Sequence, residues 1–262
     1  MDQIVGISAA GKLSVALVEG NRLISPVSEY PRPGDEPGDD SSENEFLSMP
    51  MEEIVDTVAE MVLTLCRVHN ANPVAAGMCF PGIIRDGIVA ESPNLKQAKG
   101  ANLCGMLTAA LQARALTPRI SVCNDADAAA TGIAALRGQL EHLIRVWTLG
   151  QGVGFGRYPH SEGPCEGGHI VVSLDPKEAF CGCGGHGHLE GIMGYRAMRL
   201  RFPDLEPEEV FANALQGDQR CADFELLWHR ALAAASATSI HFDGPGKFFI
   251  TGANARLSGS TC

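Results

Sequence analysis

The chain has 262 residues, 45% of them hydrophobic, which is enough for one large domain or two modest ones with an ordinary core. Its formal net charge of −11 argues against broad nucleic-acid binding, because that needs clustered Lys and Arg to neutralise phosphates. The sequence has neither a signal peptide nor an apolar run near the roughly 20 residues that span a bilayer, so we expect a cytoplasmic protein with no membrane partner and no nucleic-acid partner.

The chain begins with three short predicted strands, at residues 4–7, 14–18 and 22–24. Gly11-Lys12 forms the turn between the first two. Residues 34–45 are acidic and rich in Pro, Gly and Ser, which is typical of a solvated connection. An amphipathic helix is predicted at residues 51–70, because apolar side chains recur on one helical face. Residues 74–80 then make an apolar run of the buried-strand type.

The later elements alternate between helices and strands, which predicts an α/β protein. In chain order they are a helix at 105–116, a strand at 119–123, a helix from Asn124-Asp125, a strand at 143–149, helices at 192–202, 206–215 and 221–241, and a strand at 247–251. The strand at 143–149 ends in Gly150-Gln151-Gly152. Glycines at alternate positions fit a β-turn-β loop whose amides can approach a phosphate.

Asn124 and Asp125 stand where a predicted strand meets an alanine-rich helix. Two interpretations remain open. Either residue can simply cap the helix. Alternatively, Asp125 points into a cleft, where the hydroxyl group of an acceptor can hydrogen-bond to it.

Metal-type side chains gather between Glu166 and Glu190. Zinc prefers four thiolate or imidazole ligands in a tetrahedron, and Cys181-x-Cys183 followed by a histidine supplies three of them. His169, expected in the preceding strand, would be the fourth. The intervening glycines let the loop turn back, which favours His188 over His186 as the third ligand, although His186 stays open. The alternative is a glycine-rich turn with two reduced cysteines. The nine cysteines, an odd number, fit a reducing compartment.

The order Glu-x-x-His, then Cys-x-Cys and a later Glu, resembles the ROK family of bacterial sugar kinases and sugar-responsive repressors, with His188 at the family's third cysteine position. The resemblance runs from Gly6 to Gly252. It implies an α/β, actin-like ATPase (ribonuclease H-like) fold of two lobes, with mixed sheets flanked by helices around a central cleft. The lobes would be residues 1–123 and 124–262.

The resemblance also implies roles for individual residues. Zinc would be bound by His169, Cys181, Cys183 and His188. The sugar would be contacted by Asn94, Asn124, Asp125, Glu166, His169 and Glu190. Asp125 would be the general base. The nucleotide would be contacted by Gly11, Lys12, Gly150, Gln151, Gly152 and Gly252.

The first phosphate loop departs from the family pattern. ROK kinases carry Asp-x-Gly-Gly-Thr there, and the Asp helps to organise magnesium, whereas this chain has Ser8-Ala9-Ala10-Gly11-Lys12. A neutral Ser8 cannot supply the carboxylate that a hard cation prefers. Lys12 either contributes positive charge near a phosphate or is a solvated turn lysine. In the second loop Gln151 replaces the usual Thr, and Ala253 follows Gly252 where the family has a second Gly.

The sequence therefore predicts an ATP-dependent sugar kinase of ROK type, a homodimer with Mg²⁺, ATP and structural Zn²⁺, acting on a hexose or an N-acylhexosamine. Because the departures lie on the nucleotide side, we expect impaired transfer, and the alternative is a catalytically silent sugar-binding protein. A ROK repressor is disfavoured, since the first strand at Ile4 leaves no room for a helix-turn-helix. The sequence stops at residues 258–262, before the family's terminal elements, so we expect a naturally short or a truncated chain.

Overall fold

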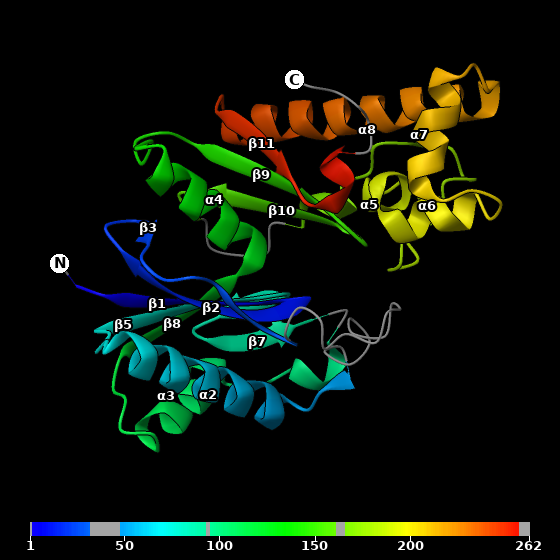
Figure 1. Cartoon of the computed structure of the whole chain (residues 1–262). Helices are drawn as coiled ribbons and strands as arrows, with labels where there is room; N and C mark the ends of the chain where they lie inside the picture. The colour runs from blue at the N-terminus through cyan, green and yellow to red at the C-terminus, as the bar shows by residue number, and fades with distance from the viewer. Residues whose placement is uncertain (1, 32–47, 93–94, 161–165, 257–262) are drawn as a thin grey trace. The chain divides into compact units, whose positions relative to one another are not determined.

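The computed structural model describes residues 2–31, 48–92, 95–160 and 166–256. The chain divides into two compact units, Met1–Ala128 and Ala129–Cys262, each with its own sheet (Figure 1). The described helices include none with the length and apolar character that crossing a membrane requires. The lobe boundary between residues 123 and 124 stays a prediction.

The first unit is organised by a six-stranded sheet in the order β3-β2-β1-β5-β8, with β4 paired to β2. Its strands are β1 (Ile4–Ala10), β2 (Lys12–Glu19), β3 (Arg22–Leu23), β4 (Ser28–Tyr30), β5 (Ala75–Phe80) and β8 (Arg119–Asn124). β1 is antiparallel to β2 and parallel to β5, and β5 is parallel to β8. The carboxyl ends of β1, β5 and β8 therefore lie at the same edge of the sheet. A separate hairpin pairs β6 (Ile83–Arg85) with β7 (Ile88–Glu91).

Helices α2 (Met51–His69) and α3 (Leu103–Gln112) lie side by side on one face of this sheet (Figure 1). The predicted helix at 51–70 is correct to one residue: Asn70 adopts the left-handed conformation and ends α2. α3 begins two residues earlier than predicted and ends four earlier. It begins there because the Asn102 side chain caps it, accepting the amide hydrogen of Gly105 at 2.9 Å. A short 3-10 helix, η1 (Lys96–Ala98), precedes it.

The second unit holds a three-stranded sheet in the order β10-β9-β11. Its strands are β9 (Ile144–Leu149), β10 (Val153–Tyr158) and β11 (Lys247–Thr251). Alternate side chains of β9 face opposite sides, as strand geometry requires. Ile144 and Val146 pack in one cluster with alanines of α4 (Asp125–Leu136), while Trp147 and Leu149 pack in another with α8 (Gln219–Asp243). The central strand is thus buried on both faces.

A helical segment follows the metal-type loop, residues 169–188, which carries the four candidate metal ligands. It comprises α5 (Glu190–Met193), α6 (Tyr195–Arg201) and α7 (Pro207–Leu215). The single helix predicted at 192–202 is wrong, since Gly194 is extended, with ψ 141°, and separates α5 from α6. A Cβ atom at Gly194 would lie 2.9 Å from the carbonyl oxygen atoms of Gln151 and Glu190. Only glycine therefore allows this break to pack against the β9–β10 turn.

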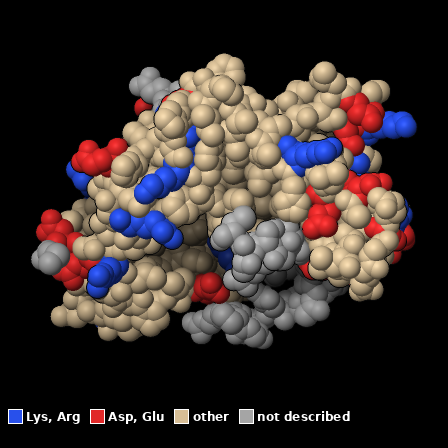
Figure 2. Space-filling view, turned by 90° about the horizontal axis from the view of Figure 1, so that it is seen from above, with Lys and Arg blue, Asp and Glu red and all other residues tan. Residues whose placement is uncertain are grey.

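Charged side chains of both signs are distributed over the surface. Figure 2 shows, on the face that it presents, acidic side chains near basic ones rather than a surface of one sign. Exposed ion pairs within single units, such as Arg220 with Asp204, add to this mixture. Such pairs contribute little stability, about 0–1 kcal/mol each.

Candidate functional site

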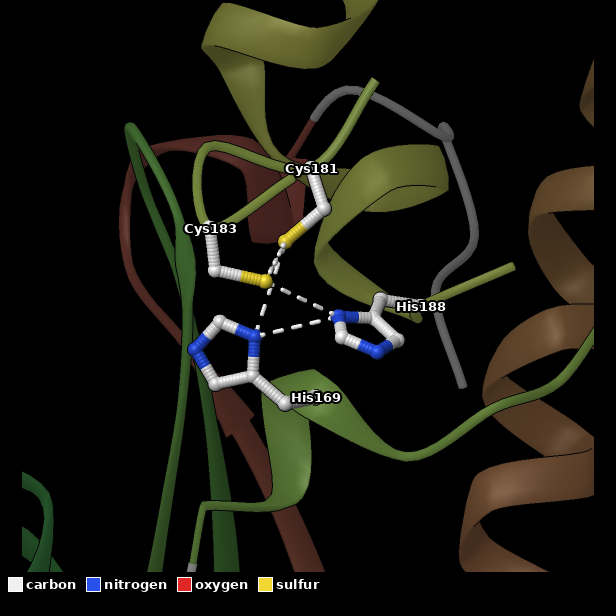
Figure 3. A group of neighbouring side chains, drawn as sticks. All are labelled: His169, Cys181, Cys183 and His188. Atoms are coloured by element: carbon white, nitrogen blue, oxygen red, sulfur yellow. Dashed lines mark hydrogen bonds between the residues drawn. The ribbon is translucent and has the colours of Figure 1, made fainter. Parts of the chain in front are cut away.

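The structure brings the four predicted metal ligands together in the second unit. The Nδ1 and Sγ atoms of His169, Cys181, Cys183 and His188 all lie within 4.8 Å of one another, and Figure 3 shows them converging on a common centre. The shorter separations are 3.2 Å for Cys183 Sγ to His188 Nδ1, 3.3 Å for His169 Nδ1 to His188 Nδ1, and 3.4 Å between the two sulfur atoms. Metal–ligand bonds of about 2.0–2.3 Å give a zinc tetrahedron edges of about 3.3–3.8 Å, so the donor set fits zinc.

Glycine geometry lets this loop close on itself. A Cβ atom at Gly185 would lie 2.1 Å from the His188 ring, and one at Gly187 would lie 1.8 Å from the carbonyl oxygen of Ser173. Gly187 also has a φ of +67°, which favours glycine. Its carbonyl oxygen accepts the amide hydrogen of Val172, which anchors the His188 side of the loop. Substitution of either glycine would therefore displace a ligand.

His169 was expected in a strand, and this is wrong: it lies in the short 3-10 helix η2 (Gly167–His169). The buried glycines of η2 pack closely on β10, with a Cβ at Gly168 lying 2.1 Å from the Val153 carbonyl oxygen. His186, the alternative ligand, is exposed and its Nδ1 lies 3.2 Å from the Pro176 carbonyl oxygen, outside the four-residue group.

Burial shapes the protonation of the cluster. Burial raises the pKa of the Cys181 thiol to about 12, and the neighbouring Cys183 and Glu190 act in the same direction through their side chains. Burial lowers the pKa of His188, and His169 adds to this shift. His188 is thus kept neutral and ready to bind a cation, whereas the Cys181 thiol needs the charge of the cation itself to deprotonate.

Glu166 and Glu190 flank the cluster in different environments. Glu166 is exposed and its carbonyl oxygen accepts the amide hydrogen of His169. Glu190 is half-buried: its Oε2 accepts the amide hydrogen of Val153 at 3.1 Å, and its Oε1 accepts the Cys181 thiol hydrogen at 3.5 Å. The carboxylate of Glu190 therefore joins the metal-type loop to the start of β10.

The Gly150-Gln151-Gly152 turn connects β9 to β10 and is closed by a bond from the Gly150 amide to the Gly152 carbonyl oxygen, 3.0 Å long. Gly252 lies beside it, because a Cβ atom there would approach the Leu149 carbonyl oxygen to 2.2 Å. Sequence reasoning missed Asn254, whose side chain is buried and donates to the Gly150 carbonyl oxygen at 3.0 Å. Its position two residues after Gly252 was the available signal.

Asn124 and Asp125 lie in the first unit, at the end of β8 and the start of α4. The Asn124 side chain accepts the amide hydrogens of Ala126 and Asp127 and donates to the Gly82 carbonyl oxygen at 2.9 Å. Asn124 is therefore the helix cap. Burial raises the pKa of the Asp125 carboxyl above its ordinary value, although the Ala126 amide acts against this shift. A desolvated carboxylate at this junction is a reactive proton acceptor.

Ser8, in the predicted first phosphate loop, has uncharged neighbours in the sheet. Ser8, Cys79 and Cys123 are register partners across β1, β5 and β8, so their side chains form one row. Burial raises the pKa of Cys79, and it raises that of Cys123 to about 11. Both thiols are therefore neutral near pH 7, and this row supplies no negative charge for a hard cation.

The remaining predicted residues are placed as follows. Gly11 turns between β1 and β2 with a φ of +83°, and the half-buried Lys12 begins β2. Asn94 lies outside the described residues.

A family model described as the ROK family matches residues 38–255. The chain belongs to the ROK family. A glucokinase of Pyrobaculum calidifontis is 27% identical over 79% of this chain and 68% of its own length. A glucokinase of Aeropyrum pernix is 29% identical over 92% of this chain and 77% of its own. The crystal structure of a ROK hexokinase from Thermus thermophilus aligns with a TM-score of 0.73 and 24% identity, covering 97% of this chain and 82% of that one.

This ROK chain has the expected α/β, actin-like ATPase fold, so the predicted family and fold class are confirmed. The roles of the individual site residues, including zinc binding, stay predictions. The arrangement itself can do three things chemically. It can hold one tetrahedral cation, approach an anion with the backbone of a rigid turn, and accept a proton at Asp125.

Proposed function

We propose that this ROK protein is an ATP-dependent sugar kinase that transfers the γ-phosphoryl group to a hydroxyl of a hexose. The observation that carries the proposal is Asp125, a half-buried carboxylate with a raised pKa at the end of a parallel strand. Sugar phosphorylation needs a base within hydrogen-bonding reach of the attacking hydroxyl. The names of the two glucokinase relatives favour glucose as the acceptor over an N-acylhexosamine.

In the proposed reaction, Asp125 accepts the proton of the sugar hydroxyl while the sugar oxygen forms its bond to the γ-phosphorus. The bond from that phosphorus to the bridging oxygen of ADP breaks, and ADP leaves. Asn124 fixes the start of α4 and hence the position of Asp125. Such positioning, with electrostatic stabilisation, supplies most of the catalysis in phosphoryl transfer.

His169 can serve both the metal and the sugar. Its Nδ1 faces the cluster, which leaves Nε2 for a sugar hydroxyl. Bound zinc would be held by His169, Cys181, Cys183 and His188, and it would fix the loop that carries Glu190. Glu166, Glu190, Asn124 and Asn94 complete the proposed set of sugar contacts.

The residues proposed to contact the nucleotide come from both parts of the sequence. Four of the proposed nucleotide contacts, Gly150, Gln151, Gly152 and Gly252, belong to the second unit, where hydrogen bonds and close packing hold their backbone. In the first unit the proposed contacts are Gly11, in the turn, and Lys12, at the start of β2, but Ser8 offers magnesium a neutral hydroxyl where a carboxylate is preferred. The residues around Ser8 therefore do not fit Mg²⁺ in the manner of the family, and we propose that turnover is impaired.

A second candidate function is favoured by the serine at position 8. Ser8 lies in one row with the neutral thiols of Cys79 and Cys123. If no other group replaces the missing carboxylate, the chain is a catalytically silent sugar-binding protein. Sugar binding is common to both candidates. Phosphoryl transfer separates them.

The deciding experiment measures turnover with magnesium and ATP over a panel of hexoses and N-acylated hexosamines, beside direct calorimetric binding of the same sugars. We expect binding of at least one hexose together with slow phosphorylation of it. Binding with no detectable sugar phosphate would establish the silent protein. Failure of every sugar to bind would refute both candidates.

A further inference from the structure

The Gly150–Val153 turn is held from two sides by the side chains of Asn254 and Glu190. On one side Asn254, only 1% exposed, donates from Nδ2 to the Gly150 carbonyl oxygen at 3.0 Å. Asn254 lies in the 3-10 helix η3 (Ala253–Arg256) that follows β11, 104 residues further along the chain. The same carbonyl oxygen accepts the amide hydrogen of Tyr195 at 2.9 Å. Gly150 is therefore fixed by two separate segments.

On the other side Glu190 holds the end of the turn. Its Oε2 accepts the amide hydrogen of Val153 at 3.1 Å, and a Cβ atom on Gly152 would lie only 2.4 Å from that oxygen. The carboxylate is thus packed directly against the glycine. The Gln151 carbonyl oxygen is also occupied, since it accepts the amide hydrogen of Arg196 at 3.3 Å.

These contacts have a common effect. They engage carbonyl oxygens of the turn and the amide at its end, so its shape is set before any ligand arrives. A turn that receives a phosphate through backbone amides works best when it is preorganised, because a mobile turn must lose conformational entropy on binding.

We propose that Asn254 and Glu190 are positioning residues for the nucleotide, which hold the Gly150–Val153 turn in its phosphate-binding shape. This inference rests on the proposed function, because it assigns the turn to ATP. For Glu190 the role is additional to the sugar contact proposed above, and Asn254 has no other proposed role.

Binding of a non-hydrolysable ATP analogue, measured by calorimetry without sugar, tests the proposal. We expect Asn254→Ala and Glu190→Ala each to raise the Kd about tenfold, as the loss of a buried hydrogen bond predicts. Glu190→Gln keeps an oxygen acceptor for the Val153 amide and should stay within about twofold of the wild type. Ser236→Ala is the matched control. It removes a half-buried hydrogen bond from Trp147 Nε1 elsewhere in the same unit and should leave the Kd unchanged.

A second readout separates this inference from the proposed function. Amide hydrogen exchange at Gln151 to Val153 should be faster in Asn254→Ala than in Ser236→Ala, because the turn loses its anchor. Folded Asn254→Ala and Glu190→Ala variants with wild-type Kd and wild-type exchange would overturn the inference and leave the kinase proposal standing. A wild type that binds no nucleotide would overturn the proposed function and, with it, the nucleotide role. If Asn254→Ala does not fold, the Glu190 pair decides the outcome.

Discussion

The turn at Gly150–Gly152 in the second unit is surrounded by its own scaffold, whereas the turn at Gly11 in the first unit is open. A Cβ atom on Gly152 would meet the Glu190 carboxylate at 2.4 Å, but a Cβ atom on Gly11 would meet nothing within 4 Å. Both turns resemble phosphate loops of ROK kinases. The second turn is fixed by four hydrogen bonds, to Asn254, Glu190, Tyr195 and Arg196. The first turn follows a strand in which Ser8 stands where the family pattern has an acid.

The contrast separates shape from charge. The Gly150–Gly152 turn of the second unit has a rigid backbone, and residue 8 of the first unit is a serine where the family pattern has the carboxylate that organises a cation. A sugar kinase with this division should bind its ligands better than it converts them.

Loss of the metal should have the largest effect. We expect the purified protein to carry about one zinc ion, His188→Ala to lose it, and His186→Ala to keep it, since His186 lies outside the cluster. Structural zinc contributes about 10–16 kcal/mol of apparent binding energy in small peptide sites, so the loop should lose its order without it. Elemental analysis of the three proteins measures this. A wild type without zinc, never exposed to a chelator, would contradict the prediction.

Local sequence patterns predicted some features of this cluster, whereas features that depend on tertiary contacts could not be predicted. The gathering of these four side chains could be predicted from sequence, because Cys-x-Cys, two histidines and their glycines lie close together along the chain, and the structure groups the four residues. The position of His169 in η2 could not be predicted from sequence, because it arises from Gly167 and Gly168 packing on β10, which is a tertiary contact. The break at Gly194 was missed for the same reason. Asn254 was missed because its partner, Gly150, lies 104 residues away.

Asp125→Asn should have the next largest effect. The amide can still accept a hydrogen bond but cannot take the hydroxyl proton, so turnover should fall about 10²- to 10⁴-fold while sugar affinity is kept. Steady-state kinetics and calorimetry on the same preparation measure the two quantities. Unchanged turnover would show that the residue is only part of the helix start. Asp127→Asn, on the same turn of α4, is the matched control.

The pH dependence of turnover and of stability follows from the Asp125 carboxyl. Burial raises its pKa, so turnover should fall as the pH drops through that raised value, with the acid limb above the ordinary range of an aspartate. The stability effect has the opposite sign. A folded-state pKa above the unfolded one means that this carboxyl destabilises the fold as pH rises past its unfolded value. Asp125→Asn should therefore melt no lower than the wild type near pH 7. A clearly lower melting temperature would argue that the carboxylate is stabilised in the fold.

The variant Ser8→Asp tests whether the missing carboxylate in the first unit limits turnover. Losing one preorganised electrostatic contact costs about 3–4 kcal/mol, or roughly 10²–10³ in rate, so Ser8→Asp should recover part of that deficit. Ser8→Asn is the control, because it has the same shape without the charge. Sugar affinity should be the same in all three proteins. Wild-type turnover of tens per second with magnesium and ATP would remove the deficit and with it the contrast between the units.

The smallest expected effects come from the two turns themselves. Gly11→Ala puts a Cβ atom into open space but at a φ of +83°, so it should cost about 1 kcal/mol of stability through backbone strain. Gly152→Ala should also cost about 1 kcal/mol, but for another reason: Glu190 must move away from the Val153 amide, which breaks a hydrogen bond. Denaturant unfolding of each variant gives the free energies.

Only Gly152→Ala should, in addition, weaken binding of an ATP analogue, because the turn changes shape. Gly132→Ala, in α4 with no atom near its Cβ position, is the control and should raise stability by about 0.5–1 kcal/mol through helix propensity. Equal nucleotide affinities for Gly11→Ala and Gly152→Ala would mean that the packing around the second turn confers stability alone. In that case the difference between the two units would lie entirely in the charge at residue 8.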